Sequence, residues 1–337
     1  MFKKLFKRVK NEYKFIEAFS LYDGTKAGFP LMIKKSPKKG PVVFLAGVLH
    51  GEEVIGIEVI HRIFENIKLK RGTLYAIPVA NMPGLSLATR FLPYGEQSKW
   101  ENLNRSFPGD ENGGPAEKIA ATIYKTIVST KPDLVISLHA DSHNSIPYII
   151  LDRFISNPDQ KLLTTTKKLA EAFGITVCNE ESLEDYLADD SENTLEGALF
   201  NFARIPAFTV ELGGPTVVKE SFVRVGVAGI KNVLETLDML DEPWRLFLAK
   251  SKIKTNYPLK MLIISGAFHS GKISYKAKLG RKIKKGEIIA TVEDIFGKVK
   301  EIIKSPADGY LISLGYHILS FPGQVVATLA VKDEKPF

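Results

Sequence analysis

The sequence predicts an α/β protein with a mixed, mostly parallel sheet flanked by helices, followed by a small C-terminal all-β domain. Strand-like and helix-like segments alternate from about residue 14 to residue 240, which is typical of a mostly parallel sheet covered on both faces. Several strand-like segments are continuously apolar, as strands buried on both faces are. After about residue 257, only short strand-like segments separated by Gly and Pro follow, which favours a separate all-β unit.

The elements of the larger part follow one another in a regular order. Strands are expected over residues 15–24, 28–36, 41–49, 73–81, 133–141, 146–152 and 207–214. Helices with apolar residues at helical spacing are expected over residues 52–67, 115–130, 157–173, 194–205 and 223–240. Pro115 and Glu117 mark the start of the second helix, because Pro and acidic residues are favoured in a first turn. In sheets of this kind, active residues gather at the carboxyl ends of the strands.

The composition of the chain changes over residues 241–258. Short strands with intervening turns are expected beyond it, over residues 261–273, 287–294, 297–305, 309–314 and 324–331. We therefore expect a larger domain over residues 1–250 and a C-terminal β domain over residues 255–337, with the boundary within residues 245–257.

The composition also narrows the classes of function. No run of about 18 apolar residues predicts a membrane span, and the basic N-terminus lacks the apolar segment of a secretory signal. The single cysteine, Cys178, excludes an intramolecular disulfide and fits a cytoplasmic protein. Because no cysteine cluster exists, any zinc site must use His and carboxylate ligands.

The net charge of +8 raises the question of a nucleic-acid partner. The basic residues are scattered, however, with Lys34, Lys35, Lys38 and Lys39 expected in a loop and another group near the C-terminus. No predicted helix carries a basic face interleaved with aromatic residues, so we expect no nucleic-acid partner. Attraction of acidic small substrates is another use of the same charge.

Polar residues stand where the predicted strand over 41–49 ends and the next helix begins. His50 and Glu53 are three residues apart there, and Gly51 permits a sharp turn between them. This spacing lets both side chains reach one point, and zinc accepts His nitrogen and carboxylate oxygen. His139 ends the predicted strand over 133–141 in the same way and supplies a third candidate ligand.

A histidine at a strand end can also be hydrogen-bonded within a loop and have no ligand. Two histidines at equivalent strand ends, with a carboxylate near one of them, favour the metal hypothesis over that reading. The remaining histidines fit the site less well: His61 is expected on a helix surface, His143 in a loop or beside the ligands, and His269 and His317 in structural positions.

Glu211 ends the apolar strand expected over 207–214. Burial of an unpaired carboxylate is costly, so its position needs either a salt bridge or a functional role. Beside a metal-bound water, Glu211 can serve as a general base whose pKa is tuned by partial burial.

The stretch from Ala88 to Gly109 has no regular period, which predicts a long loop over the sheet. It contains Arg90, Asn104 and Arg105. An arginine in such a loop can bind the carboxylate of a substrate through two parallel hydrogen bonds.

Taken together, these residues resemble the zinc carboxypeptidase superfamily, and most closely its succinylglutamate desuccinylase/aspartoacylase family. The matching segments come in the order of that family over residues 46–214: AGVLHGEE, TRFLP, NLNRSFPG, SLHAD and TVELGG. The β domain also resembles the C-terminal domain of that family.

The resemblance implies a zinc carboxypeptidase-like fold and assigns a role to each candidate. His50, Glu53 and His139 would hold one zinc ion per chain, and Glu211 would be the base that activates water and later protonates the leaving amine. Arg90 would stabilise the oxyanion. Asn104 and Arg105 would bind the carboxylate of the substrate. Asp141, two residues after His139, is a candidate for a second layer of contacts around the ligands.

Two departures from the family pattern limit what can be inferred. Asn102 replaces the usual Asp before Leu-Asn-Arg, which would loosen the anchoring of that loop. No residues match those that fix the acyl group, so the substrate is not carried over.

The C-terminal segments KKGEIIATVED and SPADGYL resemble a lipoyl or biotinyl fold without its modified lysine, which predicts a cap or assembly domain.

Three hypotheses of function follow. The first is a zinc-dependent deacylase of N-acylated amino acids or similar small amides bearing a carboxylate. The oligomeric state of this deacylase is left open, with a homo-oligomer as one alternative. The second is a metallocarboxypeptidase that trims peptides or cell-wall fragments. The third is a non-catalytic zinc-containing binding protein, against which the presence of both Glu211 and Arg90 argues, since a binding protein needs neither.

Overall fold

The computed structural model describes residues 10–93, 101–141, 144–241, 246–265, 267–315 and 318–335. His143, His317 and the first nine residues of the basic N-terminus lie outside these ranges. The strands are β1 Lys10–Ser20, β2 Lys26–Lys35, β3 Val42–Gly47, β4 Thr73–Ile77, β5 Leu134–His139, β6 Asn144–Ser145, β7 Tyr148–Leu151, β8 Thr176–Asn179, β9 Ala207–Glu211, β10 Leu259–Ser265, β11 Gly271–Tyr275, β12 Lys282–Ile283, β13 Ile288–Glu293, β14 Val299–Lys304, β15 Gly309–Leu314, β16 Leu319–Ser320 and β17 Val325–Lys332. The α-helices are α1 Ile55–Asn66, α2 Met82–Leu87, α3 Pro115–Ser129, α4 Gln160–Phe173, α5 Leu183–Ala188, α6 Leu195–Asn201 and α7 Glu220–Thr236, with short 3-10 helices η2 Leu103–Arg105 and η3 Ser191–Asn193.

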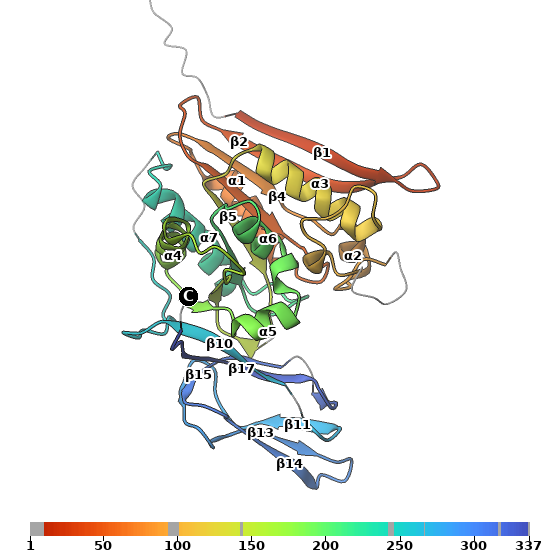
Figure 1. Cartoon of the computed structure of the whole chain (residues 1–337), viewed down its shortest axis with the longest axis vertical. Helices are drawn as coiled ribbons and strands as arrows, with labels where there is room; N and C mark the ends of the chain where they lie inside the picture. Colours follow the sequence, from red (N-terminus) through yellow and green to blue (C-terminus); the bar gives the residue numbers. More distant parts are fainter. Residues whose placement is uncertain are drawn as a thin grey trace, which may run out of the picture.

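A 13-stranded sheet runs through most of the chain in the order β1-β2-β4-β3-β5-β9-β7-β8-β10-β17-β15-β12, with β6 beside β15 (Figure 1). Strands β4, β3, β5 and β9 are parallel and form its centre. On either side of this centre, β2 runs antiparallel to β4 and β7 runs antiparallel to β9, and β1 runs antiparallel to β2. The predicted mixed sheet flanked by helices is therefore confirmed. The parallel centre matters for function, because it brings the carboxyl ends of β3, β5 and β9 to one edge.

Helices cover both faces of this sheet, as the continuously apolar strands require. On one face, α1, α4 and α7 pack against side chains such as Leu45 and Ile136, and on the other face α3 and α6 pack against Phe44 and Val135. Successive residues of a strand point to opposite faces, so β3 and β5 contribute to both cores. The side chain of His139 follows Val135 and Ser137 toward the face covered by α3 and α6.

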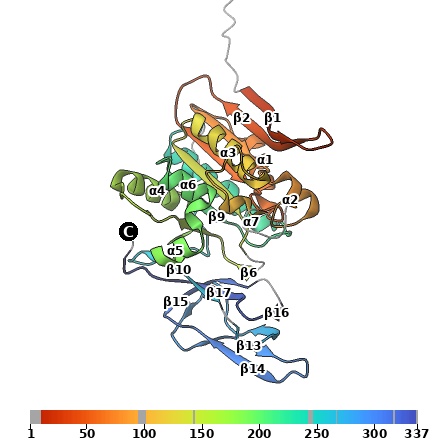
Figure 2. The same cartoon turned by 45° about the vertical axis from the view of Figure 1, so that its right-hand side comes forward.

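The C-terminal region is rich in strands, as predicted, and consists of two layers. Strands β10, β17, β15 and β12 continue the large sheet, and β14-β13-β11-β16 form a separate four-stranded sheet. A core that includes Ile289, Leu311 and Leu329 lies between the layers. In both views this region forms the end of the molecule opposite to β1 and β2 (Figures 1 and 2). The sequence did not predict that the large sheet continues into it through the pairing of Lys260 with Asn179.

Several boundaries differ from the sequence prediction. The predicted strand over 73–81 ends at Ile77, because Pro78 cannot donate a hydrogen bond to a neighbouring strand. Helices α2 and α5 and strand β8 were not predicted. The expectation that Lys34 and Lys35 lie in a loop is wrong, since β2 continues to Lys35. His61 lies on the exposed face of α1, as expected.

Lys34 is buried, with 5% of its surface exposed, and it closes the end of α1. Its ammonium group donates to the backbone carbonyls of Phe64 and Ile67, where the last carbonyls of a helix lack partners. Burial lowers the pKa of this ammonium group, but the carbonyls at the negative end of the helix dipole favour its charged form.

Replacement of Lys34 by Met is expected to lower the melting temperature of the protein by roughly 4–8 °C. The change leaves two buried carbonyls without a donor, which costs about 2 kcal/mol in total at the lower limit of about 1 kcal/mol for each group, and about 1 kcal/mol shifts Tm by roughly 2–4 °C in a domain of this size. Differential scanning fluorimetry measures it. Lys35→Met, at the exposed neighbouring position, is the control and should leave Tm within about 1 °C; equal Tm values for both variants would contradict the capping role.

Candidate active site

The segment between β3 and α1 is shaped by two unusual backbone positions. Val48 adopts φ of 53°, a left-handed conformation that is uncommon for a β-branched residue, and it turns the chain at the strand end. Gly51 lets the backbone of α2 approach closely, because a Cβ atom at this position would lie 2.0 Å from the carbonyl carbon of Gly84 in α2. The expected turn between His50 and Glu53 is present, since the Glu53 N–H donates to the His50 carbonyl at 3.1 Å across Gly51, and Gly51 is also needed because α2 packs directly against it.

His50, Glu53 and His139 come together, and each is buried, with 3%, 2% and 3% of its surface exposed. Their candidate ligand atoms all lie within 4.8 Å of one another. His50 Nδ1 lies 2.8 Å from Glu53 Oε1, and His139 Nδ1 lies 2.8 Å from Glu53 Oε2. The backbone N–H of Ala140 also donates to Glu53 Oε2 at 3.2 Å, which fixes the carboxylate between the two rings.

This donor set fits a zinc ion. Two imidazole nitrogens and one carboxylate leave a fourth position for water, as in catalytic zinc sites. Burial lowers the pKa of His50 to about 4, against the opposing effect of Glu53, so that ring is neutral and able to bind a cation. Burial also disfavours the charged form of His139, yet Glu53 and Glu196 raise its pKa well above the ordinary value. A positive charge is therefore favoured among these buried carboxylates, and a cation bound there would supply it.

Arg90 lies at the rim of this cluster. Its Nη1 donates to Glu53 Oε1 at 2.8 Å and lies 3.8 Å from Glu52 Oε1, while its side chain is 38% exposed. The backbone carbonyl of Arg90 accepts a hydrogen bond from the N–H of Gly51 at 3.3 Å. The loop that carries Arg90 is thus attached to the segment that carries His50 and Glu53.

Glu211 ends β9 directly beside His139, with which it is in register across the parallel pair. Only 9% of its surface is exposed, and its Oε2 atom has no hydrogen-bond partner among the described residues. Burial raises the pKa of Glu211 well above its usual value; the negative charges of Asp141 and Glu53 act in the same direction, and His139 opposes them. No ion pair within 4.0 Å joins Glu211 to a described basic side chain, so the salt-bridge alternative lacks support.

A second carboxylate behind His139 was missed in the sequence. Glu196, on α6, is 1% exposed, and its Oε1 atom lies 3.6 Å from His139 Nε2. Both atoms lack a hydrogen-bond partner among the described residues, and a shift of a few tenths of an ångström would join them. Asp141, the predicted candidate for this role, instead accepts a hydrogen bond from the Tyr148 hydroxyl at 2.9 Å.

Replacement of Glu196 by Gln is expected to weaken zinc binding by roughly 10–100-fold, because carboxylates that orient a ligating imidazole contribute about that much. Zinc affinity is measured by competition with a chromophoric chelator, and Tm is followed in parallel to separate unfolding from loss of the metal. Glu171→Gln, on the exposed face of α4, is the control. Wild-type zinc affinity in a folded Glu196→Gln variant would contradict this positioning role.

Asn104 and Arg105 lie in η2, in the loop that follows Arg90. Asn104 is buried, and its Oδ1 accepts from the backbone N–H of Leu195 at 2.9 Å. Arg105 donates to the carbonyls of Asp189 and Asn104 at 2.7 and 2.8 Å. Asn102 Oδ1 accepts from the N–H of Asn104 at 3.1 Å, so Asn102 takes part in holding the loop, and the expected loosening relative to Asp stays a prediction. The carboxylate-binding roles of Asn104 and Arg105 stay predictions.

A cavity of about 740 Å³ opens beside this cluster. Arg90, Arg105, Tyr148 and Glu211 line it, whereas Asn104 is absent from its described lining. Met261, from β10, also lines it. The C-terminal region therefore contributes to the wall of the cavity that holds the predicted base and both predicted arginines.

Both the sequence and the fold are similar to those of known proteins. Residues 39–237 match the family model described as the succinylglutamate desuccinylase/aspartoacylase catalytic domain. The N-alpha-acetyl-L-2,4-diaminobutyric acid deacetylase of Halomonas elongata is 25% identical over 308 residues, covering 87% of this chain and 82% of that protein.

Solved structures resemble the chain over nearly its whole length. A succinylglutamate desuccinylase from Silicibacter sp. TM1040 superposes with a TM-score of 0.80 at 19% identity, covering 98% of this chain and 97% of the other. The product-bound ectoine utilization protein EutE from Ruegeria pomeroyi superposes with a TM-score of 0.79 at 23% identity, covering 96% and 95%. These structures share the fold, and the family model covers more than half of the sequence. The chain belongs to the succinylglutamate desuccinylase/aspartoacylase family.

Proposed function

We propose that the protein is a zinc-dependent amide hydrolase that removes an acyl group from an N-acylated amino acid or a similar small amide bearing a carboxylate. The observation that carries the proposal is the convergence of His50, Glu53 and His139, with Glu211 in register beside His139 and its Oε2 atom unpartnered. The deacetylase from Halomonas elongata, whose name describes an N-acetylated amino acid as substrate, supports the same class of reaction.

His50, Glu53 and His139 would hold the zinc ion. When bound, zinc lowers the pKa of a coordinated water and polarises the carbonyl of the scissile amide. Glu196 would orient the imidazole of His139 from behind, and Ala140 N–H keeps the Glu53 carboxylate between the two rings.

Glu211 would accept the proton of the attacking water as the water oxygen bonds to the amide carbon. Its raised pKa suits a base that must then hold this proton and release it to the leaving nitrogen. Cleavage of the C–N bond gives a carboxylate and an amine. The exposed guanidinium edge of Arg90 would stabilise the negative charge that develops on the carbonyl oxygen.

Substrate binding would depend on the cavity and on Arg105, which reaches it from η2. Arg105 would bind the carboxylate of the substrate, and Asn104 would hold the loop in place through its bond to Leu195. The cavity volume of about 740 Å³ lies within the range of small-molecule sites, which favours a small amide over a long peptide.

The test is the zinc content of the purified protein, together with hydrolysis of a panel of N-acyl amino acids and of peptides of increasing length. One zinc per chain and turnover of the small amides are expected. Cleavage that improves with peptide length would favour the carboxypeptidase alternative. A folded, zinc-loaded protein that hydrolyses no amide would reject the enzyme hypothesis and favour the hypothesis of a non-catalytic zinc-containing binding protein.

Among the described residues, no helix is both long and apolar enough to cross a membrane. A cytoplasmic location, a homo-oligomer, and a domain boundary between residues 250 and 255 stay predictions.

A further inference from the structure

Strand β1 forms one edge of the large sheet, and β2 is the one strand that pairs with it in the part of the chain that the structure describes. In both views β1 lies at the end of the molecule opposite to the C-terminal region (Figures 1 and 2). The strand has 11 residues, about twice the usual strand length. Its outer side therefore presents a long row of backbone N–H and C=O groups for which no described strand is a neighbour. A row of this kind is a template for pairing with another chain, and natural proteins generally cover or interrupt it.

Two aromatic side chains project from one face of β1 and stay exposed. Tyr13 and Phe15 lie two residues apart, so both point to the same face of the sheet, and they are 66% and 51% exposed. Tyr13 is in register with Met32 of β2, which is buried in the core that includes side chains of α1. The two rings therefore extend the apolar face of the sheet beyond its edge. Exposed aromatic rings beside an unpaired strand edge favour an interaction surface.

The other face of β1 carries two opposite charges, one on each side of Tyr13. Glu12 and Lys14 point to this face, and their carboxylate and ammonium groups lie 3.6 Å apart. Their side chains are 37% and 54% exposed, whereas Ile16, on the same face, packs against the core that includes side chains of α3. A second copy of β1 that runs antiparallel, with a two-fold axis at Tyr13, would place its Lys14 directly across from Glu12 and its Glu12 directly across from Lys14. Opposite charges at such positions stabilise a pair of antiparallel strands.

The same charges disfavour the neighbouring registers. An axis at Glu12 or at Lys14 would bring two like charges together, which destabilises a strand pair. An axis at Phe15 would place Lys14 across from Ile16 and would leave both charges without an opposite charge in the second copy. An axis at Tyr13 instead brings the two Tyr13 rings together and puts each Phe15 diagonally beside the tyrosine of the other copy, within the reach of aromatic side chains. The register centred at Tyr13 therefore satisfies both faces of β1.

We infer that β1 pairs antiparallel with β1 of a second copy of this chain around a two-fold axis at Tyr13, so that the large sheets of the two copies become continuous. The backbone groups of the two edges would supply hydrogen bonds, and the aromatic and charged side chains would fix the register. A two-fold axis uses the same surface on both copies, which a self-complementary strand provides. No residue of β1 belongs to the described lining of the cavity beside the candidate zinc ligands, so the inference is independent of the proposed hydrolysis.

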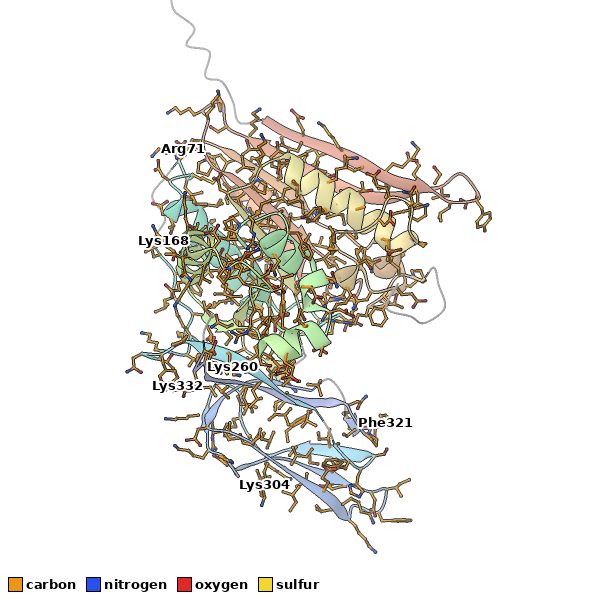
Figure 3. All side chains as sticks on the ribbon, viewed as in Figure 1. Arg71, Lys168, Lys260, Lys304, Phe321 and Lys332 are labelled. Carbon is orange, nitrogen blue, oxygen red and sulfur yellow. The ribbon has the colours of Figure 1, made fainter. Side chains whose placement is uncertain are left out.

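Sedimentation velocity over a dilution series of the full chain measures the monomer–dimer equilibrium, and the wild-type protein is expected to form a dimer. Glu12→Lys and Lys14→Glu should each raise the dissociation constant by at least about tenfold, because like charges then lie across from each other on both sides of the axis. An equimolar mixture of the two variants should form dimers with nearly wild-type affinity, since opposite charges again face each other between the copies while the pair within each strand stays broken. Lys304→Glu, a charge reversal on the edge strand β14 at the far end of the molecule, is the matched control and should keep the wild-type dissociation constant (Figure 3).

Disulfide cross-linking tests the register, and the single native cysteine, Cys178, does not interfere because it is buried. Tyr13→Cys should give a covalent dimer on mild oxidation, since residues at the axis have Cα atoms about 4.5–5.5 Å apart, within the range of a disulfide. Asn11→Cys is the control and should give none, because its two copies would be offset by four residues, or about 14 Å along the strands. A wild-type monomer at every concentration, a dimer that neither charge reversal weakens, a mixture that does not regain the dimer, or cross-linking at Asn11 instead of Tyr13 would each overturn the inference.

Discussion

Replacement of Glu211 by Gln is expected to lower kcat by about 10²–10⁴-fold, the range that a positioned general acid–base contributes. Glutamine keeps the size of the side chain at the end of β9 but cannot take a proton from water or return one to the leaving amine. The structure supports this role because the Oε2 atom is buried beside His139 and has no hydrogen-bond partner among the described residues. Steady-state hydrolysis of the best N-acetyl amino acid measures the loss.

Zinc content separates this role from the alternatives. The variant should keep one zinc per chain, since Glu211 stands beside the candidate ligands rather than among them. Glu65→Gln, at an exposed position of α1, is the control and should keep wild-type kcat. Activity within about threefold of wild type would refute Glu211 as the base. Loss of both zinc and activity would make it a ligand or a structural support instead.

The residues of the site could be predicted where they form part of a local sequence pattern. A buried strand has little reason to end in His or Glu, so His50, His139 and Glu211 stood out against the apolar runs that precede them. The parallel arrangement of β3, β5 and β9 then explains why residues far apart in the sequence meet at one edge. The expectation that these side chains share one point depended only on strand direction and strand ends.

Residues that act through tertiary contacts were not predictable in this way. Glu196 lies within the amphipathic pattern of a helix, and only the packing of α6 against β5 places it behind His139. Lys34 stands in a run of lysines that resembles a solvated loop, and only the position of α1 gives its ammonium group two carbonyls to bind.

The arrangement of the C-terminal region shows the same limit at the level of whole elements. The pattern of short strands correctly predicted a β-rich unit, because alternation and turn residues are local signals. The pairing of β10 with β8, which joins that unit to the large sheet, depends on the match between Lys260 and Asn179 across 80 residues of sequence. Such a pairing has no local signature, and with it Met261 and Ile263 come to line the cavity.

Replacement of His139 by Ala is expected to weaken zinc binding by roughly 10²–10³-fold and to abolish hydrolysis at limiting zinc. Structural zinc sites with four ligands bind with about 10–16 kcal/mol, so one ligand contributes roughly 2.5–4 kcal/mol. His139 is buried against Glu53, and no other described His, Cys or acidic side chain joins the cluster of three candidate ligands. Competition with a chromophoric chelator measures the affinity, and excess zinc should restore part of the activity.

His61→Ala provides the control, because it removes an imidazole from the exposed face of the helix that follows the candidate ligands. It should retain wild-type affinity for zinc and wild-type kcat. The affinity of the wild-type protein should also fall as pH falls, because a histidine must lose its proton before it binds a metal. If His139→Ala binds zinc as tightly as His61→Ala, the ion lies elsewhere, and the geometry of His50, Glu53 and His139 has a purely structural cause.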